Sequence, residues 1–99
     1  MIEVIVSEGC PHCDRQVSIL KQSFREEDYK VIHDGTQEFS EHELNDRVDG
    51  FPFVVIRDSK GVARFAGAGC LEANQLDERI ARYSGSPKAF NLRRARMGN

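Results

Sequence analysis

Two cysteines with two residues between them, Cys10 and Cys13, are the side chains of this 99-residue chain best suited to chemistry. A deprotonated cysteine is both the nucleophile of thiol–disulfide exchange and a ligand for zinc. Pro11 follows Cys10 and favours the first position of a helix, because its missing N–H would be unpaired there in any case. The pair is therefore predicted at a helix N-terminus, where unpaired N–H groups and the helix dipole stabilise a thiolate.

The two cysteines are expected to differ in exposure. Helical spacing is shared by Cys13, Val17, Leu20 and Phe24. Cys13 should therefore face inward, while Cys10 stays accessible. This asymmetry suits a two-step exchange, in which Cys10 attacks a disulfide and Cys13 then attacks Cys10 to release the reduced product. His12 stands between them and, when cationic, would stabilise the Cys10 thiolate.

Metal binding is the alternative chemistry of the pair. A structural zinc site needs about four ligands, so Cys70 and a histidine would have to complete the set. The sequence has no second Cys-x-x-Cys and no His-x-x-x-His pairing, and we interpret His33 and His42 as surface residues. The pattern favours redox chemistry over a metal site.

The elements that must position the cysteines follow from apolar periodicity and turn residues. Their order, β-α-β-α-β-β-α, predicts an α/β fold with a four-stranded mixed sheet flanked by helices. Strands are expected at residues 2–6, 29–33, 53–56 and 62–66, a turn at 34–35, a hairpin turn at 58–61 and a loop at 67–69. Helices are expected from Pro11 into the acidic stretch 26–28, from Ser40 to Val48, and over residues 73–83.

The second helix has two signals at its start. Ser40 and Glu43 have the spacing of a capping box, and Phe39 and Leu44 have the spacing of a hydrophobic staple. Both signals predict that this helix begins at Ser40.

Composition and charge limit the class of protein. Apolar residues make up 39% and charged residues 30% of the chain, the balance of one ordinary globular domain. The sequence contains no run of about 18 apolar residues, the length that would predict a membrane span. The first residues lack the regions of a signal peptide, so a cytoplasmic protein is expected. Three cysteines, an odd number, argue against a disulfide scaffold.

The charge is unevenly distributed along the chain. Residues 1–83 carry 10 basic and 16 acidic residues, a net charge of −6, whereas residues 84–99 carry four basic residues and no acidic one. We therefore expect a domain at residues 1–83 and a basic C-terminal tail at residues 84–99. A basic tail can bind an acidic partner, but four charges at a terminus are more often solvated, so we do not expect nucleic acid as a partner.

Over residues 1–83 the chain resembles the thioredoxin superfamily in its short, glutaredoxin-like form. The resemblance depends on the element order and on the Cys-Pro-His-Cys motif of residues 10–13 after the first strand. It also depends on Gly50-Phe51-Pro52-Phe53, which stands where the family has its cis-proline. Gly67-Ala68-Gly69 stands where glutaredoxins have a Gly-Gly turn.

The resemblance implies further site residues. It implies a cis peptide between Phe51 and Pro52, packed against the cysteines, and a Phe51 backbone that pairs with a substrate peptide. It places Gly69 and Cys70 in the turn that contributes to substrate binding, with Cys70 as a candidate regulatory thiol near Cys10. The chain has only Glu72 where glutaredoxins have an Asp pair that helps to hold glutathione.

The sequence therefore predicts a cytoplasmic thiol–disulfide oxidoreductase with Cys10 as nucleophile, Cys13 as resolving thiol and Pro11 and His12 in the catalytic motif. It would act as a protein-disulfide reductase or electron donor, for example to ribonucleotide reductase. No bound cofactor is expected beyond the redox-active Cys10–Cys13 disulfide, with glutathione as a candidate co-substrate. Its partners would be a disulfide-containing client and either glutathione or a reductase, and we expect a monomer that does not bind membranes.

Two alternative functions stay open at this point. Thioredoxin-like folds also serve as binding or adaptor modules, in which the redox pair is dispensable. A metal or iron–sulfur carrier is the second alternative.

Overall fold

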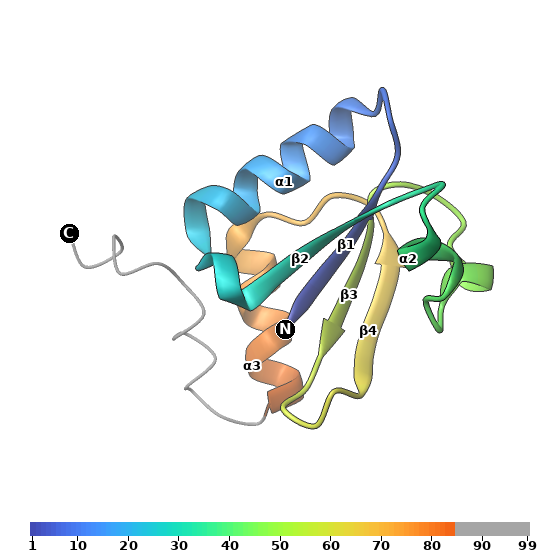
Figure 1. The fold of residues 1–99 in the computed structure, drawn as a ribbon. Coiled ribbons are helices and arrows are strands. Elements are labelled where there is room, and N and C mark those ends of the chain that lie inside the picture. Colours follow the sequence, from blue (N-terminus) through green and yellow to red (C-terminus); the bar gives the residue numbers. More distant parts are fainter. Residues whose placement is uncertain (85–99) are drawn as a thin grey trace.

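A computed structural model of the chain describes residues 1–84. It has a thioredoxin-like α/β fold with the predicted order β-α-β-α-β-β-α and a four-stranded mixed sheet (Figure 1). The elements are β1 (Ile2–Val6), α1 (Pro11–Ser23), η1 (Glu26–Asp28), β2 (Tyr29–His33), α2 (Gln37–Ser40), η2 (Asn45–Arg47), β3 (Phe53–Arg57), β4 (Ala63–Ala68) and α3 (Ala73–Ser84). Apart from Ser84, the expected basic tail lies outside the described residues.

Strand β1 lies inside the sheet, whose order is β2-β1-β3-β4. It runs parallel to β2, which requires a crossover connection, and α1 supplies that crossover. Its other neighbour, β3, is antiparallel, and so is β4 beside β3. Ile5 of β1 pairs with Phe53 of β3, and Phe53 pairs with Ala68 of β4. The end of β1, the start of β3 and the end of β4 therefore meet at one end of the sheet.

The sheet has a buried core on each face, because inward and outward side chains alternate along each strand. Helices α1 and α3 cover one face, and the segment that contains α2 covers the other (Figure 1). The first core includes Ile2, Val4, Val54, Ile56, Leu20, Phe24, Leu76 and Ile80. The second core includes Ile5, Ile32, Phe53 and Val55, with Phe39, Leu44 and Val48 packed against it. The continuous apolar run that opens β3 is buried on both faces, as predicted.

Helix α1 begins at Pro11 and ends at Ser23, earlier than the acidic stretch in which we expected it to end. Phe24 is extended and fully buried, and its N–H still bonds to the Leu20 carbonyl at 2.9 Å. Burial of the Phe24 side chain stabilises the fold by about 2 kcal/mol, and burial of Leu20 contributes a similar amount. The extended backbone at Phe24 ends the helix, and Glu26–Asp28 form a separate 3-10 turn before β2.

The predicted boundaries of the second helix are wrong. Helix α2 begins after Thr36, whose side-chain oxygen accepts a hydrogen bond from the Phe39 N–H at 3.2 Å. Ser40, the predicted N-cap, is instead the last helical residue and donates its hydroxyl to the Gln37 carbonyl at 2.8 Å. The next turn, η2, is separate and has no side-chain cap.

Hydrogen bonds of residues 40–45 explain why the helix does not continue. In a helix the Leu44 N–H would bond to the Ser40 carbonyl, but here it bonds to Nδ1 of His42 at 3.1 Å. The Ser40 carbonyl accepts instead from the side-chain amide of Asn45 at 2.6 Å. His42 in turn donates from Nε2 to the Glu3 carboxylate at 2.8 Å, which draws the chain onto the sheet.

His42 is therefore not the surface residue that we expected. Its side chain is only 7% exposed, and the Glu3 carboxylate beside it also contacts the Arg57 guanidinium at 3.1 Å. The hydrogen bond to the Glu3 carboxylate on β1 holds His42 against the sheet. The two residues are 39 positions apart, so no local sequence pattern indicates this contact. His33, in contrast, is exposed as expected.

Strand β4 extends further than predicted, since Gly67 and Ala68 belong to it and not to a loop. Their pairing with Val54 and Phe53 continues the ladder to the start of β3. At its other end the strand begins after Val62, because the Asp58 carboxylate accepts the Val62 and Lys60 N–H groups in the turn. The Val62 bond is the main cause that lowers the pKa of this carboxyl.

The helix boundary can be tested with two alanine substitutions. Thr36→Ala removes the oxygen that caps α2 and is expected to lower the free energy of unfolding by about 1 kcal/mol. Ser40→Ala, the matched control, removes a bond to an exposed helix end and should lower it by less than about 0.5 kcal/mol. Urea denaturation followed by circular dichroism measures both. A larger loss for Ser40→Ala would contradict the observed boundaries.

Candidate functional site

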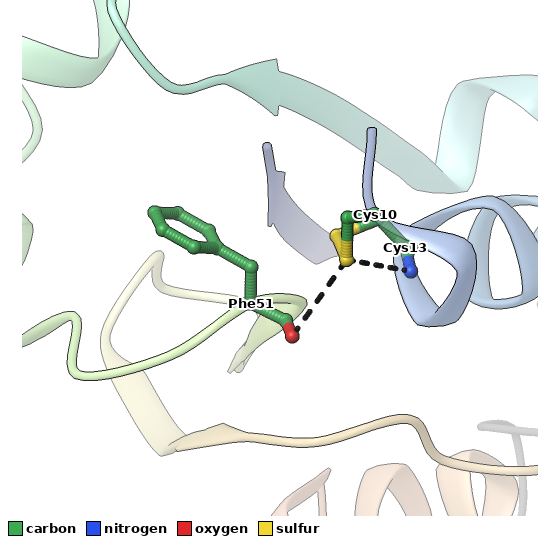
Figure 2. Close-up of a disulfide and its surroundings, with 3 residues drawn as sticks. All are labelled: Cys10, Cys13 and Phe51. Atoms are coloured by element: carbon green, nitrogen blue, oxygen red, sulfur yellow. Dashed lines mark hydrogen bonds between the residues drawn. A yellow bond between two sulfur atoms is a disulfide. The ribbon is translucent and has the colours of Figure 1, made fainter. Parts of the chain in front are cut away.

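Cys10 and Cys13 form a disulfide across the first turn of α1, with their Cα atoms 5.2 Å apart. Cys10 is the N-cap residue of the helix, and its sulfur accepts a hydrogen bond from the Cys13 N–H at 3.2 Å (Figure 2). The predicted position of the pair at a helix N-terminus is thus confirmed. A helix N-terminus stabilises negative charge, so this cap favours the thiolate of Cys10 once the disulfide is reduced.

The two sulfurs lie in different environments. Cys13 is 2% exposed and belongs to the core between the sheet and the helices α1 and α3. Cys10 is only partly buried and packs against the edge of that core. Pro11 and His12, the residues between them, are exposed. A reagent from solvent can therefore approach Cys10, while Cys13 is shielded.

The Phe51–Pro52 loop faces the disulfide from the start of β3. The peptide bond between these residues is cis, as the resemblance implies, and Pro52 is buried. The Phe51 carbonyl points towards the Cys10 sulfur at 3.9 Å, while its ring points away (Figure 2). A disulfide sulfur carries no proton, so this approach is a contact in the oxidised form and can become a hydrogen bond when Cys10 is a thiol.

The turn after β4 joins this loop. The Gly69 N–H donates to the Pro52 carbonyl at 2.8 Å. Gly69 has a φ of +119°, a conformation that side chains rarely adopt. Gly50 lies so close to β4 that a Cβ atom there would be 3.2 Å from the Cβ of Ala68. The structure thus brings Cys10, Cys13, Phe51, Pro52 and Gly69 together at one end of the sheet.

Cys70 is the free cysteine and is partly buried. The charged side chains beside it are Arg15 and Glu72, which form an ion pair with each other. Burial raises the pKa of the Cys70 thiol, and the nearby guanidinium of Arg15 opposes that increase. Its closeness to Cys10, which the resemblance implies, stays a prediction.

Gln16 is the residue near the site that our sequence interpretation missed. It is fully buried in α1, one turn after Cys13, and both ends of its side-chain amide bond to the Leu71 backbone. The signal was present, because Gln16 stands three residues after Cys13 and four before Leu20. A polar side chain on an apolar helix face requires buried partners.

A groove of about 780 Å³ lies on another side of the first turn of α1. Its lining includes Cys13 and the side of α1 formed by Asp14, Val17 and Lys21, with His33 from β2. Neither Cys10 nor the Phe51–Pro52 loop lines it. This groove and the accessible Cys10 are therefore separate features of the surface.

Two further features are absent from residues 1–84. No group of three or more His, Cys, Asp or Glu side chains within this range could hold a metal ion. No helix of this range is long and apolar enough to cross a membrane.

Comparison with known proteins adds no relative: no protein-family model, curated protein or solved structure matches this chain. The class of protein therefore depends on the fold and the site alone. They define a thioredoxin-like domain with a Cys-x-x-Cys disulfide at the N-terminus of its first helix. This arrangement indicates thiol–disulfide chemistry.

The environment of Cys70 predicts slow reaction with alkylating reagents. In the oxidised protein Cys70 is the free thiol, so iodoacetamide reports on it alone. Because the thiolate is the reactive form and burial raises the pKa, the rate should keep rising about tenfold per pH unit up to the ordinary pKa and beyond. Arg15→Ala should slow the reaction further. A rate that levels off below the pH at which free cysteine levels off would contradict this description.

Proposed function

We propose that the protein is a thiol–disulfide oxidoreductase that reduces a disulfide in a client protein. The observation that carries the proposal is the pairing of an accessible Cys10 at the helix N-cap with a buried Cys13 one turn later. Exchange in two steps needs one sulfur that solvent reagents reach and another that reaches only the first.

The reaction transfers two electrons from the cysteine pair to the client. The Cys10 thiolate attacks one sulfur of the client disulfide, which forms a mixed disulfide and releases the other sulfur as a thiolate. Cys13, deprotonated, then attacks the Cys10 sulfur, which forms the Cys10–Cys13 disulfide and releases the second client sulfur. Both client thiolates take protons from solvent at neutral pH. A second thiol compound must reduce the pair again, either two glutathione molecules or a dithiol reductase.

The Phe51–Pro52 loop is the proposed docking element for the client. It faces Cys10, and the Gly69 N–H bonds to the Pro52 carbonyl. We therefore include Gly69 and the next residue, Cys70, in the proposed surface. An extended client segment that bonds to the Phe51 backbone would present its disulfide to Cys10 as a short added strand. The client and the electron donor are proposed by chemical class only.

Two single substitutions test the assignment of the sulfurs, and each is the control for the other. Cys13→Ser should accumulate a mixed disulfide through Cys10 when the reduced protein meets insulin, because the resolving thiol is absent. Cys10→Ser should form none, since the buried Cys13 does not reach a client. Both variants also carry Cys70→Ser, so that the third thiol of the chain cannot form the adduct. Mass spectrometry under non-reducing conditions measures the adduct. Equal adducts in both variants, or none in either, would refute the proposal and favour an adaptor role.

The exposed His12 predicts the direction of a shift in reduction potential. A cation beside Cys10 stabilises the thiolate and so the reduced form, which should place the potential above the −270 mV or so of thioredoxin. His12→Tyr should lower the midpoint by about 10–20 mV, the size of an exposed charge interaction. His12→Lys places a permanent cation at this position and should not lower it. Titration in glutathione buffers measures the midpoint, and equal midpoints for the Tyr and Lys variants would remove His12 from this role.

A further inference from the structure

We propose that Gln16 is a positioning residue for client docking. In this proposal its side chain holds the turn after β4 against α1 and thereby fixes the surface that this turn shares with the Phe51–Pro52 loop. The inference rests on the function proposed above and concerns the docking step, not the exchange of sulfurs.

The Gln16 side chain makes the two hydrogen bonds to Leu71 that a neighbouring strand would otherwise make. Its Oε1 accepts the Leu71 N–H at 2.7 Å, and its Nε2 donates to the Leu71 carbonyl at 3.0 Å. A residue in an antiparallel ladder exchanges the same two bonds with its partner. Leu71 lies three residues after Ala68, the last residue of β4, and packs against the core under α1. The amide therefore replaces the ladder at the point where the sheet no longer supplies a partner.

The turn is tied to the docking loop as well as to α1. Gly69, two residues before Leu71, donates its N–H to the Pro52 carbonyl at 2.8 Å. Phe51, the residue before Pro52, has its carbonyl oxygen 3.9 Å from the Cys10 sulfur. A continuous series of contacts thus leads from the Gln16 side chain through the turn and the Phe51–Pro52 loop to Cys10. Gln16 itself bonds to neither sulfur of the disulfide.

Ordinary packing does not account for an amide at this position. A leucine or methionine would fill the same space on the apolar face of α1, whereas a buried amide is unfavourable unless every polar atom is paired. Without Gln16 both backbone groups of Leu71 would lose their partners, and the turn would have to move towards water. The nearby Arg15–Glu72 ion pair is exposed and contributes little to holding the turn.

Gln16→Met tests the proposal, because methionine has a similar length and no hydrogen-bonding amide. The KM for reduction of insulin should rise about fivefold, the factor that a lost hydrogen bond corresponds to. The rate at which the reduced protein cleaves a small aromatic disulfide such as DTNB should not change, because that reagent needs no docking surface. Leu20→Ala is the control: it lowers the melting temperature through the same helix but leaves both reactions unaltered.

The outcomes separate this inference from the proposed function. A KM for insulin that stays at the wild-type value in Gln16→Met, or a parallel loss with insulin and DTNB, would overturn the positioning role. Absence of reaction with both disulfides in the wild-type protein would instead refute the proposed function. If Gln16→Met does not fold, a chain ligated at Cys70 with an ester in place of the Leu71 amide removes one of the two bonds, Leu71 N–H to Gln16 Oε1. The KM for insulin should rise in this chain as well, and an unchanged KM would overturn the positioning role.

Discussion

The first turn of α1 must satisfy two demands on the same pair of sulfurs. They have to lie close enough to bond, and they have to face different environments, because exchange requires one accessible and one shielded thiol. One helical turn meets both demands, since residues three apart lie near each other while an N-cap residue is still outside the helix. Cys10 is the N-cap and Cys13 is buried in the core. The rest of the site is arranged around this turn.

The register of the sheet decides what surrounds that turn. Ile5, Phe53 and Ala68 form one row across β1, β3 and β4. The loop after β1 leads to Cys10, the loop before β3 carries Phe51 and Pro52, and the turn after β4 carries Gly69 to Leu71. A slip of one residue between β1 and β3 would exchange their two faces and remove this convergence. The chemistry of the site therefore depends on a pairing made within the core.

Local signals made the site predictable, whereas contacts distant in sequence did not. The strand β1, the N-terminus of α1 and the buried run of β3 depend on neighbouring residues, and the sequence predicted them correctly. The cis bond at Pro52 followed only from the resemblance, because an isolated X–Pro pair is usually trans. The extent of α2 depends on the bond between His42 and Glu3, which no local pattern reveals. Ser40, the predicted N-cap, is the last residue of this helix, and Thr36 caps it instead.

Irregular backbone is what a docking surface requires and what a folded core tolerates least. In the docking surface proposed above, the groups that face a client cannot all be paired in a sheet. A loop that packs beneath a helix, however, cannot leave its N–H and C=O groups without partners. This domain meets both conditions by using side chains as partners for the backbone at the margin of the site. The Cys10 sulfur accepts the Cys13 N–H, and the Gln16 amide bonds to both groups of Leu71. A backbone hydrogen bond from the Gly69 N–H to the Pro52 carbonyl then connects the turn after β4 to the loop before β3. The buried glutamine is thus explained by the same constraint as the cysteine cap, because each supplies bonds that the sheet cannot.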